Sequence, residues 1–236
     1  MSISKNNYSD KSAVKDMFNN IAPNYDTLNH VLSFGIDKIW RKKLIKQLIS
    51  NKPEKVLDVA TGTGDLAFNL LKKHNAEVVA VDISTNMMEI ARQKAKKNNI
   101  TNVSFMEASA ENLPFDDNSF DAVMVAFGIR NFADLNKGLA EMRRVLKTKG
   151  KVFILEFSEP NKFPLKNLYK FYSKHFIPAI GKLISKNKYA YKYLPETIAE
   201  FPKNEKMVEI ITNNGYINCI YYKYTGGICN LYVAEK

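Results

Sequence analysis

Cysteine and tryptophan are scarce in this 236-residue sequence, which contains two cysteines and one tryptophan. Cys219 and Cys229 form no Cys-x-x-Cys pair and have no histidine cluster nearby, so the sequence indicates neither a disulfide framework nor a zinc site. The three histidines, His30, His74 and His175, are scattered singly. We therefore expect reduced buried thiols, no metal centre and no catalytic histidine.

Long hydrophobic runs are also missing. No stretch approaches the roughly 18 consecutive apolar residues of a membrane-spanning helix, and the first thirty residues lack the apolar core of a secretory signal. A cytoplasmic location is the expectation. No Pro/Gly/Ser-rich linker divides the chain, and a hydrophobic content of 45% is typical of a folded protein. We expect one domain spanning residues 1–236.

Acidic residues are absent from Lys162 to Lys192, a segment that contains eight lysines and several aromatic residues. The net charge of the chain is +11, and this segment is its basic pole. Clustered positive charge suits anionic lipid headgroups or nucleic acid, and charge alone does not choose between them. Four of the lysines recur every fourth residue along an amphipathic pattern, which predicts either a helix lying on a membrane surface or a solvated helix face. These four are Lys162, Lys166, Lys170 and Lys174.

The middle of the chain alternates apolar strand patterns with amphipathic helix patterns, which predicts a doubly wound parallel sheet. Two or three helices precede it, and two apolar runs joined by Thr225-Gly226-Gly227 predict a terminal hairpin that adds an antiparallel strand. This arrangement is typical of class I methyltransferases. The expected layout is a helical cap at 1–50, a cofactor-binding core at 51–160, a basic helical insertion at 161–202, and a terminal helix with the hairpin at 203–236.

The most informative motif is a strand that runs through Gly62 and Gly64 into a helix. With Ala67 in the third position it satisfies a relaxed dinucleotide-binding pattern, and Asp82 ends the next strand about 20 residues on, where ribose hydroxyls are usually bound. A nicotinamide-dependent oxidoreductase must therefore be weighed.

Electrostatics argue against a dinucleotide. Asp58 and Asp65 would place carboxylates near the helix N-terminus that a pyrophosphate would otherwise occupy. S-adenosylmethionine carries an ammonium and a sulfonium instead, so acidic groups attract it. The loop containing Ser109 and Ala110 follows the third strand, at the corner where methyltransferases hold the adenine. The motif therefore favours S-adenosylmethionine, and the expected class is an α/β class I methyltransferase with a Rossmann-like, seven-stranded, mostly parallel sheet.

Several further motifs make the resemblance more specific. They are Tyr25-Asp26, Ser33-Phe34-Gly35, Trp40-Arg41, Leu113-Pro114-Phe115, Phe127-Gly128-Ile129-Arg130-Asn131, Leu155-Glu156-Phe157-Ser158 and Tyr224-Thr225-Gly226-Gly227-Ile228. With these motifs the chain resembles the bacterial ubiquinone and menaquinone C-methyltransferases from about Val14 to about Ala234. The resemblance implies cofactor contacts at Thr63, Asp82, Ser109 and Ala110. Ala126 stands where many members have serine, so a side-chain hydrogen bond there is not expected.

The implied reaction is C-methylation of a prenylated quinol, and we expect a demethylmenaquinol in preference to a benzoquinol precursor of ubiquinone. Arg130 is expected to activate the quinol hydroxyl through a water or by stabilising the phenolate, since arginine is effectively always protonated; its alternative is a structural ion pair with Asp26 or Glu156. The expected catalytic residues are Arg130, Asn131 and Asp65; the cofactor residues are Thr63, Asp82, Ser109, Ala110, Gly62, Gly64, Asp58 and Ile83; and the substrate residues are Tyr25 and Asp26.

The expected partners follow from this reaction. They are the prenylated quinol and the inner face of the membrane, reached through the Lys162–Lys192 segment, with no nucleic acid and no metal. The sequence also allows a homodimer. A non-catalytic binding module on the same fold is the remaining alternative, and it predicts that Arg130→Ala leaves any activity intact.

Overall fold

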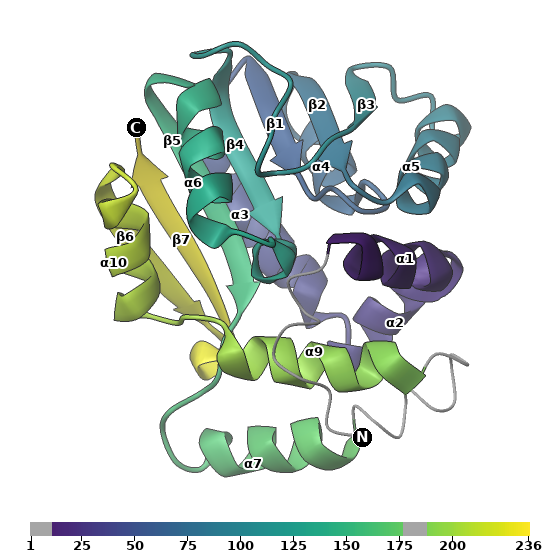
Figure 1. Cartoon of the computed structure of the whole chain (residues 1–236), viewed down its shortest axis with the longest axis vertical. Helices are drawn as coiled ribbons and strands as arrows, with labels where there is room; N and C mark the ends of the chain where they lie inside the picture. The colour runs from purple at the N-terminus through teal and green to yellow at the C-terminus, as the bar shows by residue number, and fades with distance from the viewer. Residues whose placement is uncertain (1–10, 177–187) are drawn as a thin grey trace.

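Seven strands form one sheet in the computed structural model, which describes residues 11–176 and 188–236 (Figure 1). The strand order is β3-β2-β1-β4-β5-β7-β6, with β1 to β5 parallel and β7 antiparallel to both of its neighbours. The strands are β1 (Lys55–Val59), β2 (Glu77–Asp82), β3 (Val103–Glu107), β4 (Phe120–Ala126), β5 (Leu146–Phe157), β6 (Ile217–Tyr224) and β7 (Cys229–Glu235). The expected mostly parallel sheet with a terminal antiparallel hairpin is confirmed.

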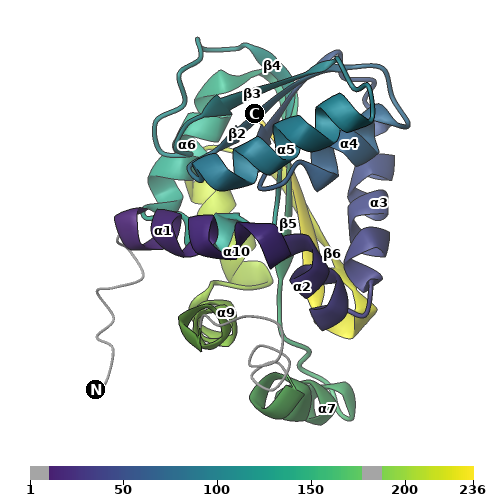
Figure 2. The same ribbon diagram turned by 90° about the vertical axis from the view of Figure 1, so that its right-hand side faces the viewer.

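Both faces of the sheet are covered by helices, as a parallel sheet requires (Figure 2). Helices α3 (Ile36–Ile49), α4 (Asp65–Leu71) and α5 (Thr85–Lys97) lie on one face, and α6 (Leu135–Val145) and α10 (Glu205–Asn213) lie on the other. Ser84 and Asp134 begin α5 and α6 by accepting hydrogen bonds from backbone amides of the first turn, which otherwise have no partner.

The hydrophobic core is divided by the sheet into two parts. Successive side chains of a strand point to opposite faces, so Val56 packs against α3 and α4 while Leu57 packs against α6. Both side chains are fully buried. This alternation explains why the central strands read as continuous apolar runs in the sequence.

The remaining helices gather where the parallel strands end (Figures 1 and 2). The N-terminal helices pack onto α5 and α9 through a small apolar cluster that includes Val14, Met17, Met87 and Tyr193. The helices and helical turns at this end of the sheet are α1 (Lys11–Ile21), η2 (Ala22–Asn24), α2 (Tyr25–Leu32), η3 (Ile129–Asn131), α7 (Leu165–Phe171), η4 (Tyr172–Phe176), α9 (Lys188–Glu200) and η5 (Thr225–Gly227). They place a helical layer over the edge of the sheet where ligands bind in this class of fold.

The start of β5 is irregular. β5 begins at Leu146, directly after α6, and its first residues include the exposed Lys147 and Lys149. Leu146 is fully buried and pairs with Phe120 of β4, and the register then shifts before Lys151 pairs with Ala122. Burial of Leu146 therefore keeps an irregular, charged stretch within the sheet.

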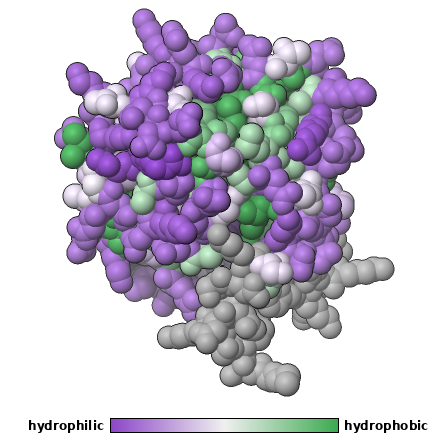
Figure 3. Space-filling model, turned by 45° about the horizontal axis from the view of Figure 1, so that its top comes forward, coloured by the Kyte–Doolittle hydropathy of each residue, from purple (hydrophilic) through white to green (hydrophobic). Residues whose placement is uncertain are grey.

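The surface is mostly hydrophilic in the view of Figure 3, where hydrophobic side chains gather in one hollow framed by hydrophilic ones. Within 11–176 and 188–236, no helix combines the length and the apolar character needed to cross a bilayer. Part of the basic segment, residues 177–187, lies outside the described residues.

Candidate functional site

The glycine loop after β1 forms the floor of a pocket. Gly62 has a φ of +58°, and a side chain at this position would approach the ring of Tyr25. Gly64 begins α4 with a φ of +85°, and a Cβ there would lie 2.6 Å from the ring of Phe68. Both positions favour glycine because of their positive φ, and at Gly64 the ring of Phe68 also leaves no space for a side chain.

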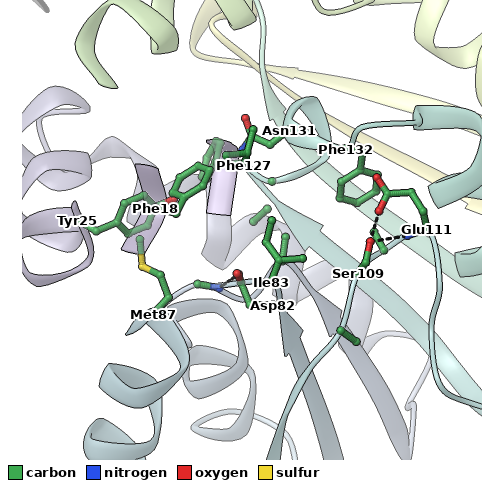
Figure 4. A pocket seen from close by; sticks show the side chains of 17 residues that line it. Phe18, Tyr25, Asp82, Ile83, Met87, Ser109, Glu111, Phe127, Asn131 and Phe132 are labelled. Atoms are coloured by element: carbon green, nitrogen blue, oxygen red, sulfur yellow. Dashed lines mark hydrogen bonds between the residues drawn. The ribbon is translucent and has the colours of Figure 1, made fainter. Parts of the chain in front are cut away.

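Asp82 ends β2 beside this loop. Its carboxylate accepts hydrogen bonds from the backbone amides of Gly62 and Ser84, each at 2.8 Å, and borders the pocket (Figure 4). Burial raises the pKa of Asp82, whereas the amide hydrogen bonds lower it. The two amides fix the carboxylate in place, and its remaining lone pairs can accept hydroxyl groups of a ligand.

A second carboxylate lies at the far end of the pocket. Glu111 accepts a hydrogen bond from the Ser109 hydroxyl and another, at 2.7 Å, from the amide of Ala133 (Figure 4). Its side chain is buried, and the ring of Phe132 stands beside it in Figure 4. Glu111 therefore fixes the loop after β3 against the start of α6 and makes this end of the pocket acidic.

The pocket encloses about 650 Å³ of space, counting its open side. Its lining includes the carboxylates of Asp82 and Glu111 and, among the described residues, contains no lysine, arginine or histidine. The described lining residues are Val14, Phe18, Tyr25, Ala60, Gly62, Asp82, Ile83, Met87, Ala108, Ser109, Ala110, Glu111, Ala126, Phe127, Gly128, Asn131 and Phe132. Because it combines apolar walls with two acids, the pocket suits a cationic nucleoside better than a pyrophosphate.

Five of the expected cofactor residues meet in this pocket: Gly62, Asp82, Ile83, Ser109 and Ala110. The other three lie outside its lining. Gly64 turns the chain beneath it, and Asp58 is buried behind the loop, where it accepts a hydrogen bond of 2.7 Å from the Thr61 hydroxyl. Burial raises the pKa of Asp58 to about 7 against the lowering effect of that hydroxyl. Asp58 therefore supports the loop from inside the fold.

Thr63, the third of these residues, belongs to a polar cluster between the cap and the loop. Its hydroxyl donates to Asp26 at 2.5 Å, and Lys94 of α5 pairs with Asp26 at 2.5 Å and with Asp65 at 3.0 Å. Asp26 and Asp65 thus face one lysine instead of lining the pocket, with His30 3.8 Å from Asp65. The cluster links α2, α4 and α5 where they meet beside the pocket.

Arg130 lies in η3, just beyond β4, and borders a second, smaller cavity instead of the first pocket. It forms a 2.7 Å ion pair with Glu156, and both side chains are buried. Burial alone would lower the pKa of Arg130, but the charge of Glu156 raises it above its ordinary value, so the guanidinium stays cationic. Its Nε is buried and has no hydrogen-bond partner among the described residues.

Tyr25 separates the two cavities, because it lines both. Burial raises the pKa of Tyr25, and the nearby charge of Arg130 lowers it. Asn131, which lines the first pocket, accepts a hydrogen bond of 2.9 Å from the hydroxyl of Tyr193 in α9. The three elements α2, η3 and α9 thus bring a buried cation and two phenols together around the second cavity.

Sequence reasoning missed several residues of this site. Met87 and Phe132 line the pocket through long-range packing that no local pattern predicts. Tyr193 of α9 lines the second cavity and donates a hydrogen bond to Asn131. Glu111 stands two residues after Ser109 in the expected adenine loop, and that position was the available signal. Within the described ranges, no group of three histidine, cysteine or acidic residues could hold a metal ion.

Comparisons with known proteins agree with this geometry. A model of the ubiE/COQ5 methyltransferase family matches residues 4–236. Similar proteins include a demethylmenaquinone methyltransferase of Bacteroides fragilis, 49% identical over 225 residues, which are 94% of this chain and 92% of that protein. Another of the same name, from Chlorobaculum tepidum, is 44% identical over 96% of this chain and 93% of its own length. A ubiquinone/menaquinone biosynthesis C-methyltransferase of Geotalea uraniireducens is 44% identical, covering 94% and 96%.

Solved structures share the fold at lower identity. A SAM-dependent methyltransferase from Aquifex aeolicus matches with a TM-score of 0.60 and 22% identity, covering 83% of this chain and 88% of that one. A SAM-dependent methyltransferase from Thermotoga maritima, described as a possible histamine N-methyltransferase, matches with a TM-score of 0.65 and 19% identity, covering 94% and 99%. At these identities the likeness shows the fold alone.

Proposed function

The chain belongs to the ubiE/COQ5 methyltransferase family, and we propose that it acts as one domain that methylates a ring carbon of a demethylmenaquinol with S-adenosylmethionine. Relatives at 49% and 44% identity are named demethylmenaquinone methyltransferase, which supports this acceptor. A benzoquinol precursor of ubiquinone is the second candidate, because another relative at 44% identity is named for both quinones. The observation that carries the proposal is the acidic pocket at the ends of β1, β2 and β4, with a buried arginine beside it.

The pocket residues fit S-adenosylmethionine, which supplies a methyl group activated by a sulfonium. Asp82 accepts the ribose hydroxyls, and Ser109, Ala110 and Phe132 enclose the adenine at the end closed by Glu111. Gly62 and Gly128 line the pocket without a side chain, so their backbone is accessible to the amino-acid part. A nicotinamide dinucleotide fits less well, because the lining offers its pyrophosphate no basic side chain.

The quinol ring lies in the second cavity, between Tyr25 and Arg130. A phenol with a pKa near 10 becomes a much stronger carbon nucleophile when it loses its proton. The cationic Arg130 stabilises that phenolate, and its unpartnered Nε supplies a donor that the fold leaves unused. Asn131, held by Tyr193, orients the hydroxyl or a water beside it.

The remaining expected site residues act by position. Thr63, Asp26 and Asp65 share hydrogen bonds and ion pairs with Lys94, so they hold the N-terminal cap against the glycine loop. Asp58 supports the same loop from behind through Thr61. The cap therefore brings Tyr25 over the cofactor site, and methyl transfer then depends on holding donor and acceptor close and aligned.

Membrane contact through α7 and the residues before it is also part of the proposal. Lys162, Lys166 and Lys170 are exposed beside the exposed side chains of Phe163 and Phe171. Such a basic and aromatic surface suits anionic headgroups at the inner face of a membrane, where a prenylated quinol is dissolved. Changing the three lysines to glutamine should lower affinity for phosphatidylglycerol vesicles roughly 100-fold, at about 1 kcal/mol per charge.

A matched control removes three exposed lysines from another face, through Lys73→Gln, Lys96→Gln and Lys97→Gln. Both triple variants lose the same net charge, so only a specific surface role separates them in vesicle sedimentation. Equal losses in the two variants would show that net charge alone attracts the protein to the vesicles.

The decisive test of function measures transfer of a labelled methyl group from S-adenosylmethionine to reduced demethylmenaquinol. The native chain should form labelled menaquinol, Asp82→Ala should lose cofactor binding, and Arg130→Ala should keep cofactor binding while kcat falls roughly 100- to 1000-fold. Because Arg130→Ala leaves Glu156 buried without its partner, the double change Arg130→Gln with Glu156→Gln provides a neutral comparison. If Arg130 stabilises the phenolate, activity of the variants recovers as the pH approaches 10.

Two outcomes would contradict this assignment. If the native protein binds the cofactor but transfers the label only to a benzoquinol, the substrate is a ubiquinone precursor and not demethylmenaquinol. Full activity in Arg130→Ala would remove Arg130 from the reaction and leave its ion pair with Glu156 as a structural one.

A further inference from the structure

An apolar groove opens on the side of the helical layer away from the cofactor pocket. It encloses about 1280 Å³, counting its open side, and lies between the α2–α3 turn, α7 and α9. Its side chains are almost all apolar or aromatic, and several of them are unusually exposed: Phe34 at 68%, Leu168 at 65% and Phe171 at 63%. A groove of this kind exposes more apolar surface than a folded chain normally leaves in water, which indicates a binding site.

The groove is one of three consecutive cavities. Phe18 and Tyr25 line both the cofactor pocket and the small cavity beside Arg130. Asn29, Leu32 and Leu194 line both that cavity and the groove. A ligand whose reacting ring lies beside Arg130 therefore has one apolar continuation, past Leu32 and Leu194 and into the groove.

Polarity changes along this series in a way that matches one class of ligand. The cofactor pocket contains Asp82 and Glu111, and the small cavity contains the charge of Arg130. The groove has no charged residue among the described residues that line it. A demethylmenaquinol has the same order of parts, with a polar ring at one end and an isoprenoid chain at the other. Burying each methylene of that chain strengthens binding about fourfold, so even two isoprene units would contribute strongly to affinity.

We propose that this groove binds the isoprenoid tail of the quinol substrate, with the ring held beside Arg130. The inference rests on the proposed function for the identity of the ring, but the groove itself can be tested without any reaction. The open side of the groove is bordered by α7, which carries Lys166 and Lys170, so the tail leaves the groove next to the surface proposed to face the membrane. The substrate can then enter ring first without leaving the lipid completely.

Trp40 gives this proposal a direct readout. It is the single tryptophan of the chain and lines the groove. Its indole donates a 2.9 Å hydrogen bond to Thr225, and its ring centroid lies 6.1 Å from that of Phe157, which also lines the groove. A chain that fills the groove changes the surroundings of this one fluorophore.

The variants are chosen on α7, where exposed positions tolerate a charge. Leu168→Glu and Phe171→Glu each place a carboxylate in the groove, whereas Asn167→Glu adds the same charge to the same helix outside the groove lining. Because all three positions are exposed, folding should be retained, and circular dichroism verifies it.

The first experiment titrates each protein with farnesol, an isoprenoid with no quinone ring, and follows Trp40 emission. Saturable changes are expected in the native chain and in Asn167→Glu, with affinity reduced about tenfold in Leu168→Glu and Phe171→Glu. Absence of a response in the native chain, or equal responses in all four proteins, would overturn the groove assignment. A second copy of the chain is the other possible occupant, and light scattering on the same samples tests it by measuring the molecular mass. A native dimer that stays intact with farnesol present, and whose Trp40 emission does not respond to farnesol, would assign the groove to the second copy.

The second experiment compares kcat/KM for a demethylmenaquinol with a two-isoprene tail and for the same ring without a tail, in the absence of membranes. The native preference for the tailed substrate should shrink about tenfold in Leu168→Glu and Phe171→Glu and stay unchanged in Asn167→Glu. An unchanged preference in the groove variants would overturn the proposal. If no quinol is methylated at all, the proposed function fails, while the farnesol titration still decides the groove.

Discussion

Replacing Glu156 with glutamine removes the negative charge that faces Arg130 and keeps the size of the side chain. The ion pair joins atoms 2.7 Å apart, and its two side chains are 1% and 6% exposed. Unit charges about 4 Å apart attract each other by about 4 kcal/mol at an effective dielectric constant of 20, and removing one partner of a buried pair costs about 3–5 kcal/mol. The glutamine amide can still accept the hydrogen bond that the Phe157 amide donates to Glu156, so the loss comes from the uncompensated arginine.

Thermal unfolding measures this loss. For a chain of this size, 1 kcal/mol shifts Tm by about 2–4 °C, so Glu156→Gln should lower Tm by about 6–20 °C. The control is Glu159→Gln, which removes a 2.7 Å pair with Lys203 whose carboxylate side chain is 45% exposed. An exposed pair contributes at most about 1 kcal/mol, so this variant should lose no more than about 4 °C. Equal decreases in the two variants would refute the idea that Arg130 is a buried cation that depends on Glu156.

Three further predictions follow from the site. Asp82→Ala should weaken binding of S-adenosylhomocysteine at least about 100-fold in calorimetry, since two charge-assisted hydrogen bonds to the ribose are lost. A loss of affinity below tenfold would show that Asp82 does not bind the ribose hydroxyls. Because burial raises the pKa of Asp58 to about 7, native Asp58 keeps a proton that the unfolded chain loses near pH 4. The free energy of unfolding of the native chain should therefore fall by up to about 4 kcal/mol between pH 4 and 7. Asp58→Asn lacks this titration, so in urea unfolding its stability relative to the native chain should rise over that range. A stability difference that stays constant with pH would contradict the raised pKa. Gly64→Ala should lower the free energy of unfolding by about 1–2 kcal/mol because of its positive φ, and by more because the new Cβ clashes with Phe68. Gly35→Ala is the control: its φ is +73° but the space around it is open, so it should lose only the roughly 1–2 kcal/mol that comes from the backbone.

The sequence predicted the order of strands and helices because their signals are local. Gly62 and Gly64 marked the turn after β1, and Asp82 marked the end of β2, since each depends on neighbouring residues and on the parallel register that joins the two strands. In a parallel sheet these ends necessarily meet at one edge. Five of the expected cofactor residues therefore line one pocket.

The expected charges of the glycine loop show where such reasoning stops. Asp58 and Asp65 were expected near the cofactor because they flank the loop in sequence. Within β1, however, the Asp58 side chain is buried and accepts a hydrogen bond from Thr61, and Asp65 in the first turn of α4 faces Lys94. The acidic character of the pocket comes from Asp82 and Glu111. Which of several nearby carboxylates faces a ligand depends on side-chain direction and on partners distant in sequence, and a motif contains neither.

The order of the last strands has a consequence for synthesis of the chain. In the sheet, β7 lies between β5 and β6, so β6 is joined to the other strands through a strand that is made after it. A ribosome delivers the chain from its N-terminus, so β6 emerges before its partner exists and β5 keeps an open edge meanwhile. A chain in which β7 has not yet joined the sheet would present the unpaired edges of β5 and β6 to other chains. Pairing of Cys229–Glu235 with both strands is therefore the step that closes the sheet.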